Sequence, residues 1–329
     1  MKDSVQSTRV RLARNVKGYP FPRKVSASQA RLIENKVFGA MGHGNRLYSI
    51  KALGEIEAGT LMEKHLVSKE LLRSKYGSVV VSDDESVGIM LNEEDHIRIQ
   101  VILKGLKLSE AYALADGIDD RIAERTTYAY SDKYGYLTAC PTNLGTGMRA
   151  SVMMFLPALT ITDNLMDSIK SLGMLNITVR GVYGEGSKAE GFVYQISNQR
   201  TLGMTEQEIL QLVDEAVERL ARAESVARNY LIEERKVYIT DEIMRAYGIA
   251  SNAYTLSVEE YAKYNALIKL GAYYGILKVS NVMKLDELAT AVQPYSLTAT
   301  ASEKRDLIEG MEVYRAKTVR EGLRSIIDN

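Results

Sequence analysis

The chain has 329 residues and a mass of 36.6 kDa, which is enough for one large domain or two domains with their own cores. Its 42 basic and 42 acidic residues cancel, which argues against a general nucleic-acid binder. One cysteine and three scattered histidines exclude an internal disulfide framework and a spaced metal site. No apolar run could span a membrane, and the N-terminus lacks the apolar segment of a signal peptide. We therefore expect a cytoplasmic protein.

The first predicted element is a strand over residues 7–14, where apolar and cationic residues alternate. Residues two apart on a strand share a face, so Arg9 and Arg11 should point the same way. Further predicted elements are a helix from Ser28 to Met41, a glycine-rich loop over 42–60, a short helix capped by Ser68, a hairpin over 79–91, a helix from Ser109 to about Thr126, strands over 136–139 and 148–156, a helix capped by Thr162, and a strand over 176–180.

An acidic motif follows the hairpin, Leu91-Asn92-Glu93-Glu94-Asp95-His96-Ile97-Arg98-Ile99-Gln100. The alternation around Ile97 and Ile99 predicts a strand, on which Glu94, His96 and Arg98 would point into one site. A solvated surface strand could carry the same charges. Other features of the chain must therefore decide between the two interpretations.

Two loops carry turn residues that let backbone N–H groups approach a ligand. The first is Cys140-Pro141-Thr142-Asn143-Leu144-Gly145-Thr146-Gly147, and the second is Gly181-Val182-Tyr183-Gly184-Glu185-Gly186-Ser187. From Thr205, which forms a capping box with Glu208, the pattern becomes helical, with further helices expected near Thr240, Ser257, Asp286 and Ser302. Strands followed only by helices predict an α+β domain to about residue 235 and a helical domain beyond.

Five arginines lie at predicted strand ends or beside glycine-rich turns. Each guanidinium is a rigid fork of donors that matches phosphate oxygens, so five together would neutralise a nucleoside triphosphate. Its Mg²⁺ would be held mainly by phosphates and water. Each arginine alone could be a surface charge, and the chain has neither a P-loop nor the eukaryotic protein-kinase motifs. The five are Arg9, Arg11, Arg98, Arg149 and Arg180.

Four motifs in register resemble the signatures of the phosphagen (guanidino) kinases, the ATP:guanido phosphotransferase family. They are Ser7-Thr8-Arg9-Val10-Arg11, Asn92–Arg98, Cys140–Gly145 with Arg149, and Arg180-Gly181-x-x-Gly184-Glu185. The resemblance implies transfer of the γ-phosphoryl group of MgATP to a guanidinium nitrogen. It also implies an α+β fold, with a mainly antiparallel sheet flanked by helices in a catalytic domain over 1–235 and an all-α domain over 236–329.

The resemblance also implies roles for individual residues. The five arginines would bind phosphates, and His65 would pack near the adenine. Glu94 and Glu185 would clamp the acceptor guanidinium, with Glu94 as the general base, and Cys140 would lie against it as a thiolate. From the residues alone, Cys140 could equally be a small buried hydrophobe. The nucleotide site would be lined by Ser7, Thr8, Arg9, Val10, Arg11, Arg149, Ala150, Ser151, Val152, Met153, Arg180, Gly181, Val182, Tyr183, Gly184 and Glu185.

Kinases of small guanidines carry a helical domain before the first motif, and here that motif begins at Ser7, so we expect no such domain. The layout is similar to bacterial protein-arginine kinases of the McsB type. This similarity implies protein substrates with exposed arginines, a role in protease-linked quality control and stress response, a zinc-binding activator of the McsA type, Clp protease partners, and a dimer or higher oligomer. Alternatives are a kinase of a free guanidino compound and a silent phosphoarginine-binding adaptor.

Two segments of the helical region leave alternatives open. Residues 311–316 align with an Arg-Asp-x-x-Arg-Ala element that binds phosphoarginine in the McsB type, but the leading arginine is missing. The segment from Ser302 to Ile327 could instead be an amphipathic packing helix. The apolar stretch from Tyr261 to Leu277 suits either a dimer interface or an internal core.

Overall fold

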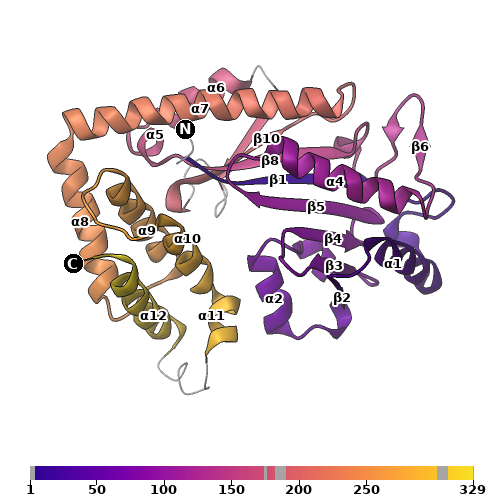
Figure 1. The fold of residues 1–329 in the computed structure, drawn as a ribbon, viewed down its shortest axis with the longest axis horizontal. Helices are drawn as coiled ribbons and strands as arrows, with labels where there is room; N and C mark the ends of the chain where they lie inside the picture. The colour runs from indigo at the N-terminus through magenta and orange to yellow at the C-terminus, as the bar shows by residue number, and fades with distance from the viewer. Residues whose placement is uncertain (1–3, 174–175, 182–189, 302–309, 329) are drawn as a thin grey trace. The chain divides into compact units, whose positions relative to one another are not determined.

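The computed structural model describes residues 4–173, 176–181, 190–301 and 310–328 (Figure 1). Its contacts divide the chain into two compact units. The first comprises residues 1–154, 170–179 and 195–219, and the second comprises residues 155–169, 180–194 and 220–329. The chain is mixed α and β, with a helical C-terminal region, as the sequence predicted. A domain boundary at residue 235 stays a prediction.

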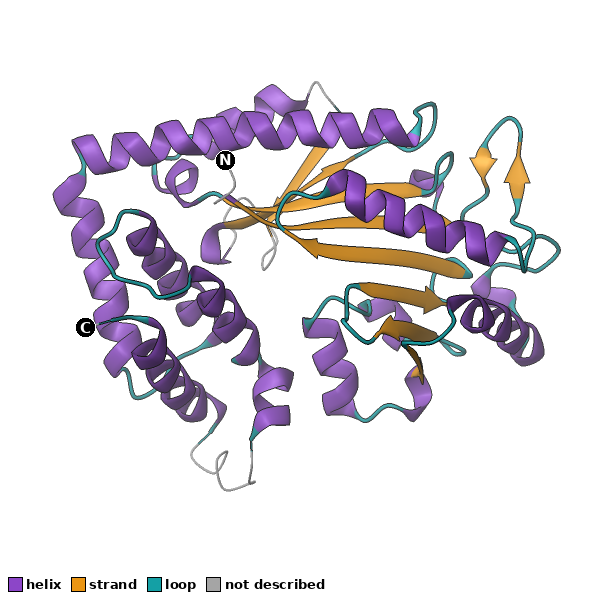
Figure 2. Ribbon diagram, in the orientation of Figure 1, coloured by secondary structure: helices purple, strands orange, loops and turns teal. Residues whose placement is uncertain are grey.

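Eight strands form one sheet in the order β2-β3-β4-β5-β1-β8-β10-β9 (Figure 2). The pairings of β1 with β5 and β8, and those along β2 to β5, are antiparallel. Strand β1 therefore has a neighbour on each side. The strands are β1 (Val5–Arg14), β2 (Asn45–Ser49), β3 (Ser78–Ser82), β4 (Val87–Leu91), β5 (Ile97–Lys104), β8 (Met148–Phe155), β9 (Ile177–Gly181) and β10 (Val193–Asn198).

One face of this sheet is a hydrophobic core. Val10 and Leu12 of β1 and Ile99 of β5 have no exposed surface. Helix α4 (Leu108–Ala123) packs over β1 and β5, and helix α1 (Ala27–Met41) packs beside α4 (Figure 1). Helix α4 can do so because small and aliphatic residues recur at helical spacing on its buried side. These residues are Ala111, Ala115, Ile118 and Ile122.

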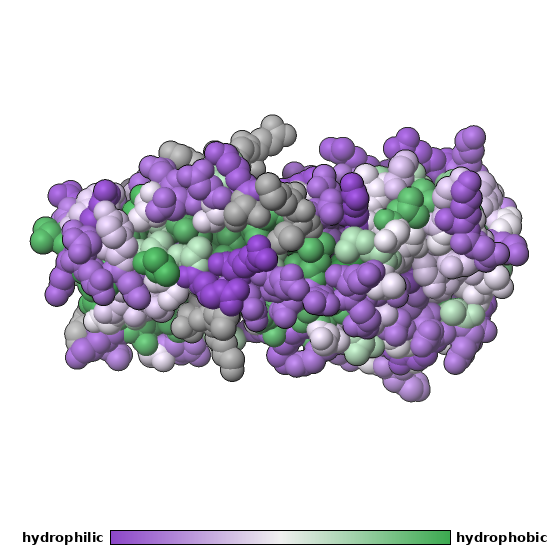
Figure 3. Space-filling model, turned by 90° about the horizontal axis from the view of Figure 1, so that it is seen from above, coloured by the Kyte–Doolittle hydropathy of each residue, from purple (hydrophilic) through white to green (hydrophobic). Residues whose placement is uncertain are grey.

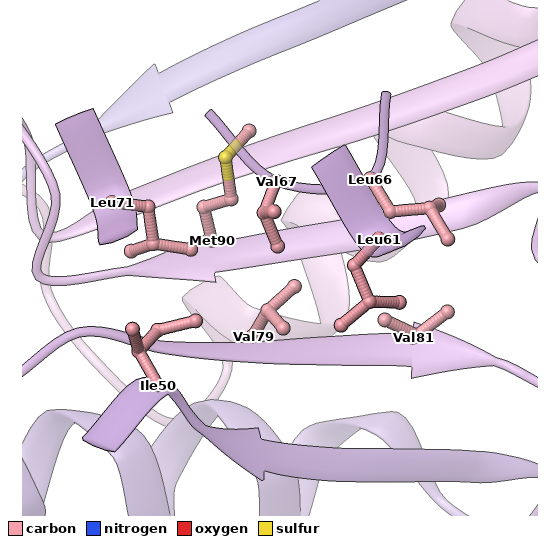
Figure 4. Close-up of a cluster of buried hydrophobic side chains, with 8 residues drawn as sticks. All are labelled: Ile50, Leu61, Leu66, Val67, Leu71, Val79, Val81 and Met90. Atoms are coloured by element: carbon pink, nitrogen blue, oxygen red, sulfur yellow. The ribbon is translucent and has the colours of Figure 1, made fainter. Parts of the chain in front are cut away.

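The opposite face of the sheet is apolar over some strands and cationic over others. Over β3 and β4 it is covered by α2 (Glu55–Glu63), α3 (Lys69–Leu72) and the segment between them. Their apolar side chains meet those of the strands in a buried cluster (Figure 4), and each fully buried aliphatic side chain contributes roughly 1.5–3 kcal/mol. The cluster consists of Ile50, Leu61, Leu66, Val67, Leu71, Val79, Val81 and Met90.

On the same face, the neighbouring strands carry arginines instead of apolar residues. Residues opposite each other on antiparallel strands point to one side. Met90 of the cluster is the register partner of Arg98, and Arg11 is the partner of Arg149. One sheet face is therefore a hydrophobic core over β3 and β4 and a cationic surface over β5, β1 and β8.

Buried charges hold together part of the second unit. The Glu224 carboxylate accepts hydrogen bonds from the backbone N–H groups of Ala158 (3.1 Å) and Leu159 (2.9 Å), and it pairs with Arg228 at 2.7 Å. The Arg228 guanidinium lies over the ring of Tyr273, 4.4 Å from its centroid. The other α-helices in the described residues are α5 (Pro157–Ile161), α6 (Leu165–Gly173), α7 (Glu206–Glu234), α8 (Lys236–Asn252), α9 (Val258–Tyr273), α10 (Val282–Ala291), α11 (Pro294–Thr300) and α12 (Met311–Ile326).

Several predicted element boundaries are wrong for identifiable reasons. The N-cap of α1 is Ser26, not Ser28, because only Ser26 has a glutamine three residues later to complete a capping box. The segment 42–60 is not a loop, since it contains β2 and the start of α2. Thr162 ends α5 instead of starting a helix, and α8 begins at Lys236, before Thr240.

The strand expected over 136–139 is also shorter than predicted. The strand β7 (Gly135–Tyr136) pairs with β6 (Tyr130–Ser131), and beyond it the Ala139 N–H bonds to the Asp95 carboxylate and not to a strand. The capping boxes at Thr205 and Ser257 are confirmed. The helix start expected at Ser302 lies outside the described residues, and α10 begins after Asn281, before Asp286.

None of the described helices is both long and apolar enough to cross a membrane. Hydrophilic side chains cover most of the face seen in Figure 3, and hydrophobic residues appear on it in small groups. Such scattered apolar exposure is normal for protein surfaces. In α9, Tyr261, Leu267 and Leu270 are buried within the chain itself, which favours an internal core for this stretch over an interface.

Candidate active site

Four of the five predicted arginines come together on the cationic face of the first unit. Arg9 and Arg11 lie two apart on β1, Arg149 is the register partner of Arg11 on β8, and Arg98 is the partner of Ala13 on β5. Burial, and then the charges of Arg149 and Arg98, lower the pKa of Arg9 to about 10. Burial and the same kind of repulsion also lower the pKa of Arg11. The guanidinium groups therefore feel one another's charge.

Among the described residues, few acidic side chains pair with these four cations. Arg98 pairs with Glu93 at 2.6 Å, and its Nη2 lies 3.7 Å from the Glu94 carboxylate. Arg9 and Arg149 donate to neutral groups on β10, the side-chain oxygens of Gln195 (3.0 Å) and Ser197 (3.1 Å). The buried Nε of Arg11 has no hydrogen-bond acceptor among the described residues. Several cations close together, with an unpaired Arg11 donor among the described residues, are the arrangement that binds a polyanion.

The acidic motif forms a tight turn before β5 and not a continuous strand. Asn92 adopts a left-handed conformation (φ 55°), its N–H bonds to the His96 carbonyl, and β5 begins only at Ile97. The prediction that His96 points into the site is wrong. His96 is fully buried, its Nδ1 accepts from the Val16 N–H, and its Nε2 donates to the Pro20 carbonyl.

The turn separates the two glutamates of the motif. The Glu93 side chain points inward, where it accepts hydrogen bonds from Ser68 Oγ and Arg98. The Glu94 side chain is 42% exposed on the side of Arg98. Partial burial raises the pKa of Glu94, and the neighbouring charges of Asp95 and Glu93 add to this against the effect of Arg98. Glu93 thus fixes an arginine, and Glu94 is the carboxylate that a substrate can reach.

Asp95 connects this turn to the loop that contains Cys140. Its Oδ1 accepts hydrogen bonds from the Asn15 side chain and the Ala139 N–H, both at 2.6 Å. Cys140 follows Ala139 directly, is partly exposed, and has its Sγ 3.0 Å from Thr142 Oγ1. This exposure does not fit the buried-hydrophobe interpretation of Cys140. Asp95 therefore holds the segments bearing Glu94 and Cys140 in a fixed relation.

The other nucleotide-site residues divide between the two sheet faces. Ser151 is the register partner of Arg9, and Ser7 is the partner of Met153, two residues further along both strands. Ser7, Ser151 and Met153 therefore share the arginine face. His65 lies close enough to Arg9 for that charge, after desolvation, to lower its pKa. The side chains of Thr8, Val10, Ala150 and Val152 lie on the opposite, buried face and pack the core.

The second predicted loop cannot be assigned to this cluster. Arg180 and Gly181 end β9, and Arg180 is exposed in the second unit. Val182, Tyr183, Gly184 and the second glutamate of the predicted clamp, Glu185, lie outside the described residues. Their roles stay predictions.

Some site residues were not predicted from the sequence. Gln195 and Ser197 complete the arginine cluster from β10, and Gln100 lies beneath it. Two polar residues at strand spacing in Tyr194-Gln195-Ile196-Ser197 are a signal that could have indicated Gln195 and Ser197. No sequence pattern distinguishes Glu93 from Glu94, because the turn at Asn92 decides which one is buried.

The degenerate element in α12 has a structural role. Arg315 is 3% exposed and donates to the carbonyl oxygens of Val292 (2.9 Å) and Leu256 (3.0 Å). These bonds tie α12 to the end of α10 and to the segment before α9. They favour the interpretation of this segment as a packing helix.

Comparison with known families agrees with this site. The model of the ATP:guanido phosphotransferase C-terminal catalytic domain matches residues 31–227, which is more than half of the chain. The chain belongs to the ATP:guanido phosphotransferase family. A second model, the protein-arginine kinase McsB C-terminal domain, matches residues 236–329. Strand β1, with Arg9 and Arg11, precedes the first match but pairs with β5 and β8 inside it.

Relatives and solved structures from this family align over most of the chain. The protein-arginine kinase of Caldanaerobacter subterraneus is 45% identical over 304 residues, 90% of each chain. That of Shouchella clausii is 42% identical over 335 residues, 98% of this chain and 92% of its own. A lombricine kinase structure has a TM-score of 0.62 at 26% identity, over 70% of this chain and 69% of its own. A Schistosoma mansoni taurocyamine kinase with transition-state-analogue components has a TM-score of 0.61 at 29% identity, over 68% of this chain and 33% of its own.

Proposed function

We propose that this kinase transfers the γ-phosphoryl group of MgATP to arginine side chains of proteins. The observation that carries the proposal is the set of four mutually repelling arginines beside a reachable carboxylate, Glu94. Fixed cations lower the energy of charge that spreads over the oxygens of a transferred phosphoryl group. The nucleotide would bring its own Mg²⁺, coordinated by phosphate oxygens and water.

In this proposal Glu94 activates the acceptor. A guanidinium is a poor nucleophile because its lone pairs are delocalised and its pKa exceeds about 12. A carboxylate beside it aligns the attacking nitrogen and takes its proton while the new N–P bond forms and the bond to ADP breaks. Cys140, held through Asp95, would place a thiolate on the same guanidinium. The second predicted carboxylate of the clamp is Glu185.

Two observations support a protein substrate over a free guanidino compound. Relatives that are 45% and 42% identical over at least 90% of their length are named protein-arginine kinases. The McsB C-terminal domain model also matches residues 236–329 of this chain. The solved lombricine and taurocyamine kinases represent the competing alternative, since their names indicate small guanidines.

The proposal extends to the cellular setting. We expect a cytoplasmic, dimeric or larger enzyme that marks proteins for Clp-type proteases during stress and responds to a McsA-type activator. Pull-down from cells of the source organism, with and without heat stress, tests these partners. Recovery of no protease subunit and no zinc-binding partner under either condition would reject this part of the proposal.

The central experiment compares the wild-type enzyme with Glu94→Gln. Incubation with ATP and an arginine-bearing protein, followed by mass spectrometry without acid, should detect phosphoarginine in the wild type. Glu94→Gln should lower the rate several hundred-fold or more, within the roughly 10²–10⁴ range of general acid–base catalysis. A matched control is Glu110→Gln, which alters an exposed glutamate paired with Lys107 on α4.

Each result has a defined meaning. Equal protein phosphorylation by wild type and Glu94→Gln would reject Glu94 as the base. Phosphorylation of free arginine without protein arginine would favour the small-guanidine kinase. Binding of phosphoarginine protein without ATP turnover would favour the silent adaptor.

A further inference from the structure

The buried Glu93 carboxylate joins two parts of the candidate site. Its side chain is 1% exposed, and three donors among the described residues bond to it. Oε1 accepts from Ser68 Oγ and from Arg98 Nη1, the latter at 2.6 Å. Oε2 accepts from the Glu94 backbone N–H at 3.2 Å. A rotation of this one carboxylate would therefore disturb both an arginine of the cationic face and the backbone of the reachable glutamate.

Ser68 is the donor that belongs neither to the acidic turn nor to β5. Its Oγ also accepts a hydrogen bond from the Leu71 N–H (3.0 Å), which makes Ser68 the N-cap of α3. A hydroxyl has one proton to donate and an ionised carboxylate can only accept, so that proton lies on the bond to Glu93. Hydrogen bonds to an ionised partner are stronger than those between neutral groups. Ser68 therefore caps a helix and fixes a carboxylate of the site at the same time.

The hydrophobic cluster over β3 and β4 holds this serine in place. Leu71, on the same short helix, has no exposed surface and packs in that cluster (Figure 4). Just after α3, Ser74 Oγ donates to the Asn92 carbonyl at 2.5 Å. Asn92 is the residue whose left-handed conformation bends the acidic motif. The segment 68–74 thus bonds to two successive residues of the turn and is itself anchored in the core.

We propose that Ser68 is a positioning residue for phosphoryl transfer. Its hydroxyl keeps the Glu93 carboxylate in the orientation in which one oxygen holds Arg98 on the cationic face and the other holds the Glu94 backbone. Ser68 touches neither substrate nor reacting atoms, and it acts through Glu93. This inference rests on the proposed kinase function. It makes the packing of α3 part of the geometry that sets the rate.

The first test is ATP turnover by Ser68→Ala with a protein acceptor. Loss of one hydrogen bond to a charged group should lower kcat about ten- to hundredfold. The KM for ATP should stay within about threefold, because the other arginines still bind the phosphates in the ground state. Ser68→Thr keeps both the hydroxyl and the capping oxygen, so it should restore kcat to within about threefold of wild type.

Two further variants separate the bond to Glu93 from the capping of α3. Aspartate caps a helix as well as serine does, but its carboxylate would repel that of Glu93. Ser68→Asp should therefore lose more activity than Ser68→Ala, although it keeps the cap. The matched control is Ser26→Ala, which removes the N-cap hydroxyl of α1 in the same unit and should leave kcat unchanged.

A double variant tests whether Ser68 acts through Glu93. Glu93→Ala removes the carboxylate, so nothing remains for the hydroxyl to orient. In that background Ser68→Ala should add no further loss of kcat. Additive losses would show that Ser68 acts by another route, and they would overturn the inference.

Two other results would also overturn it. One is an unchanged kcat in Ser68→Ala, and the other is wild-type activity in Ser68→Asp, which would leave Ser68 only its capping role. If Ser68→Ala fails to fold, the comparison of Ser68→Asp with wild type still decides. Wild-type protein that turns over no ATP would instead reject the proposed function, and the inference with it.

Discussion

Strand β1 carries arginines on both faces of the sheet, and the two sets have opposite roles. Arg9 and Arg11 face the cationic surface, where burial and the charges of other arginines lower their pKa values. Arg14 faces the other side and is 1% exposed. The same residue type, within six positions of one strand, thus forms a ligand site on one face and part of the core on the other.

The difference lies in what surrounds each guanidinium. Arg14 binds Asp119 through Nε (2.8 Å) and Nη2 (2.7 Å), donates to the Thr146 carbonyl (2.9 Å), and lies 3.5 Å from the centroid of the Tyr136 ring. Its charge is fully compensated inside the protein. Among the described residues no carboxylate forms an ion pair with Arg11, and Glu93 acts on its charge less than burial and the other arginines do, so the Arg11 charge is available to an anionic ligand. A half-buried arginine without an acid partner among the described residues therefore indicates a binding site more clearly than an exposed arginine does.

The largest effect is expected from Arg14→Met, which should lower the free energy of unfolding by about 3–5 kcal/mol. The substitution leaves the Asp119 carboxylate buried without its cation. Urea denaturation measures the change, with Arg23→Met, an exposed arginine, as the control. A loss no greater than that of the control would show that the Arg14–Asp119 pair does not stabilise the core.

Arg11→Met should give the reverse pattern. We expect kcat to fall about 10²–10³-fold, the usual cost of removing one group that stabilises transition-state charge. The free energy of unfolding should stay constant or rise, because the substitution removes a charge that Arg9, Arg98 and Arg149 repel. Turnover and urea denaturation of the same preparation measure both quantities. A destabilisation as large as that of Arg14→Met would remove the distinction between the two faces.

The smallest effect concerns pH and sharpens the role of Glu94. The pKa of Glu94 in the folded protein is raised above the ordinary glutamate value of 4.5. As the pH falls, Glu94 is therefore protonated earlier than an ordinary glutamate, and a protonated Glu94 cannot act as a base. The rate should therefore fall about tenfold per pH unit on an acid limb that begins above this value.

The sign of the stability effect follows from the same shift. The folded state favours protonated Glu94, so the stability that this proton contributes is present at low pH and is lost as pH rises through the folded-state pKa. Glu94→Gln should accordingly be no less stable than wild type at neutral pH, as urea denaturation can measure. An acid limb centred at the ordinary glutamate pKa, or a less stable Glu94→Gln, would contradict the assignment.

The sequence by itself determined the kinase family, the α+β class and the arginines that matter. Alternation on β1 places Arg9 and Arg11 on one face whatever the rest of the fold does, because strand geometry is local. The capping boxes at Thr205 and Ser257 were equally readable, since their partners lie three residues apart.

Only the tertiary structure decided which charged residues are buried and what compensates them. The left-handed turn at Asn92 sends Glu93 inward and Glu94 outward, and long-range contacts bury His96 against Val16 and Pro20. The hydrogen bond from Gln100 to the His65 carbonyl joins residues 35 positions apart. Periodicity reports the direction of a side chain relative to its neighbours, whereas burial and charge compensation depend on segments that meet only in the folded chain.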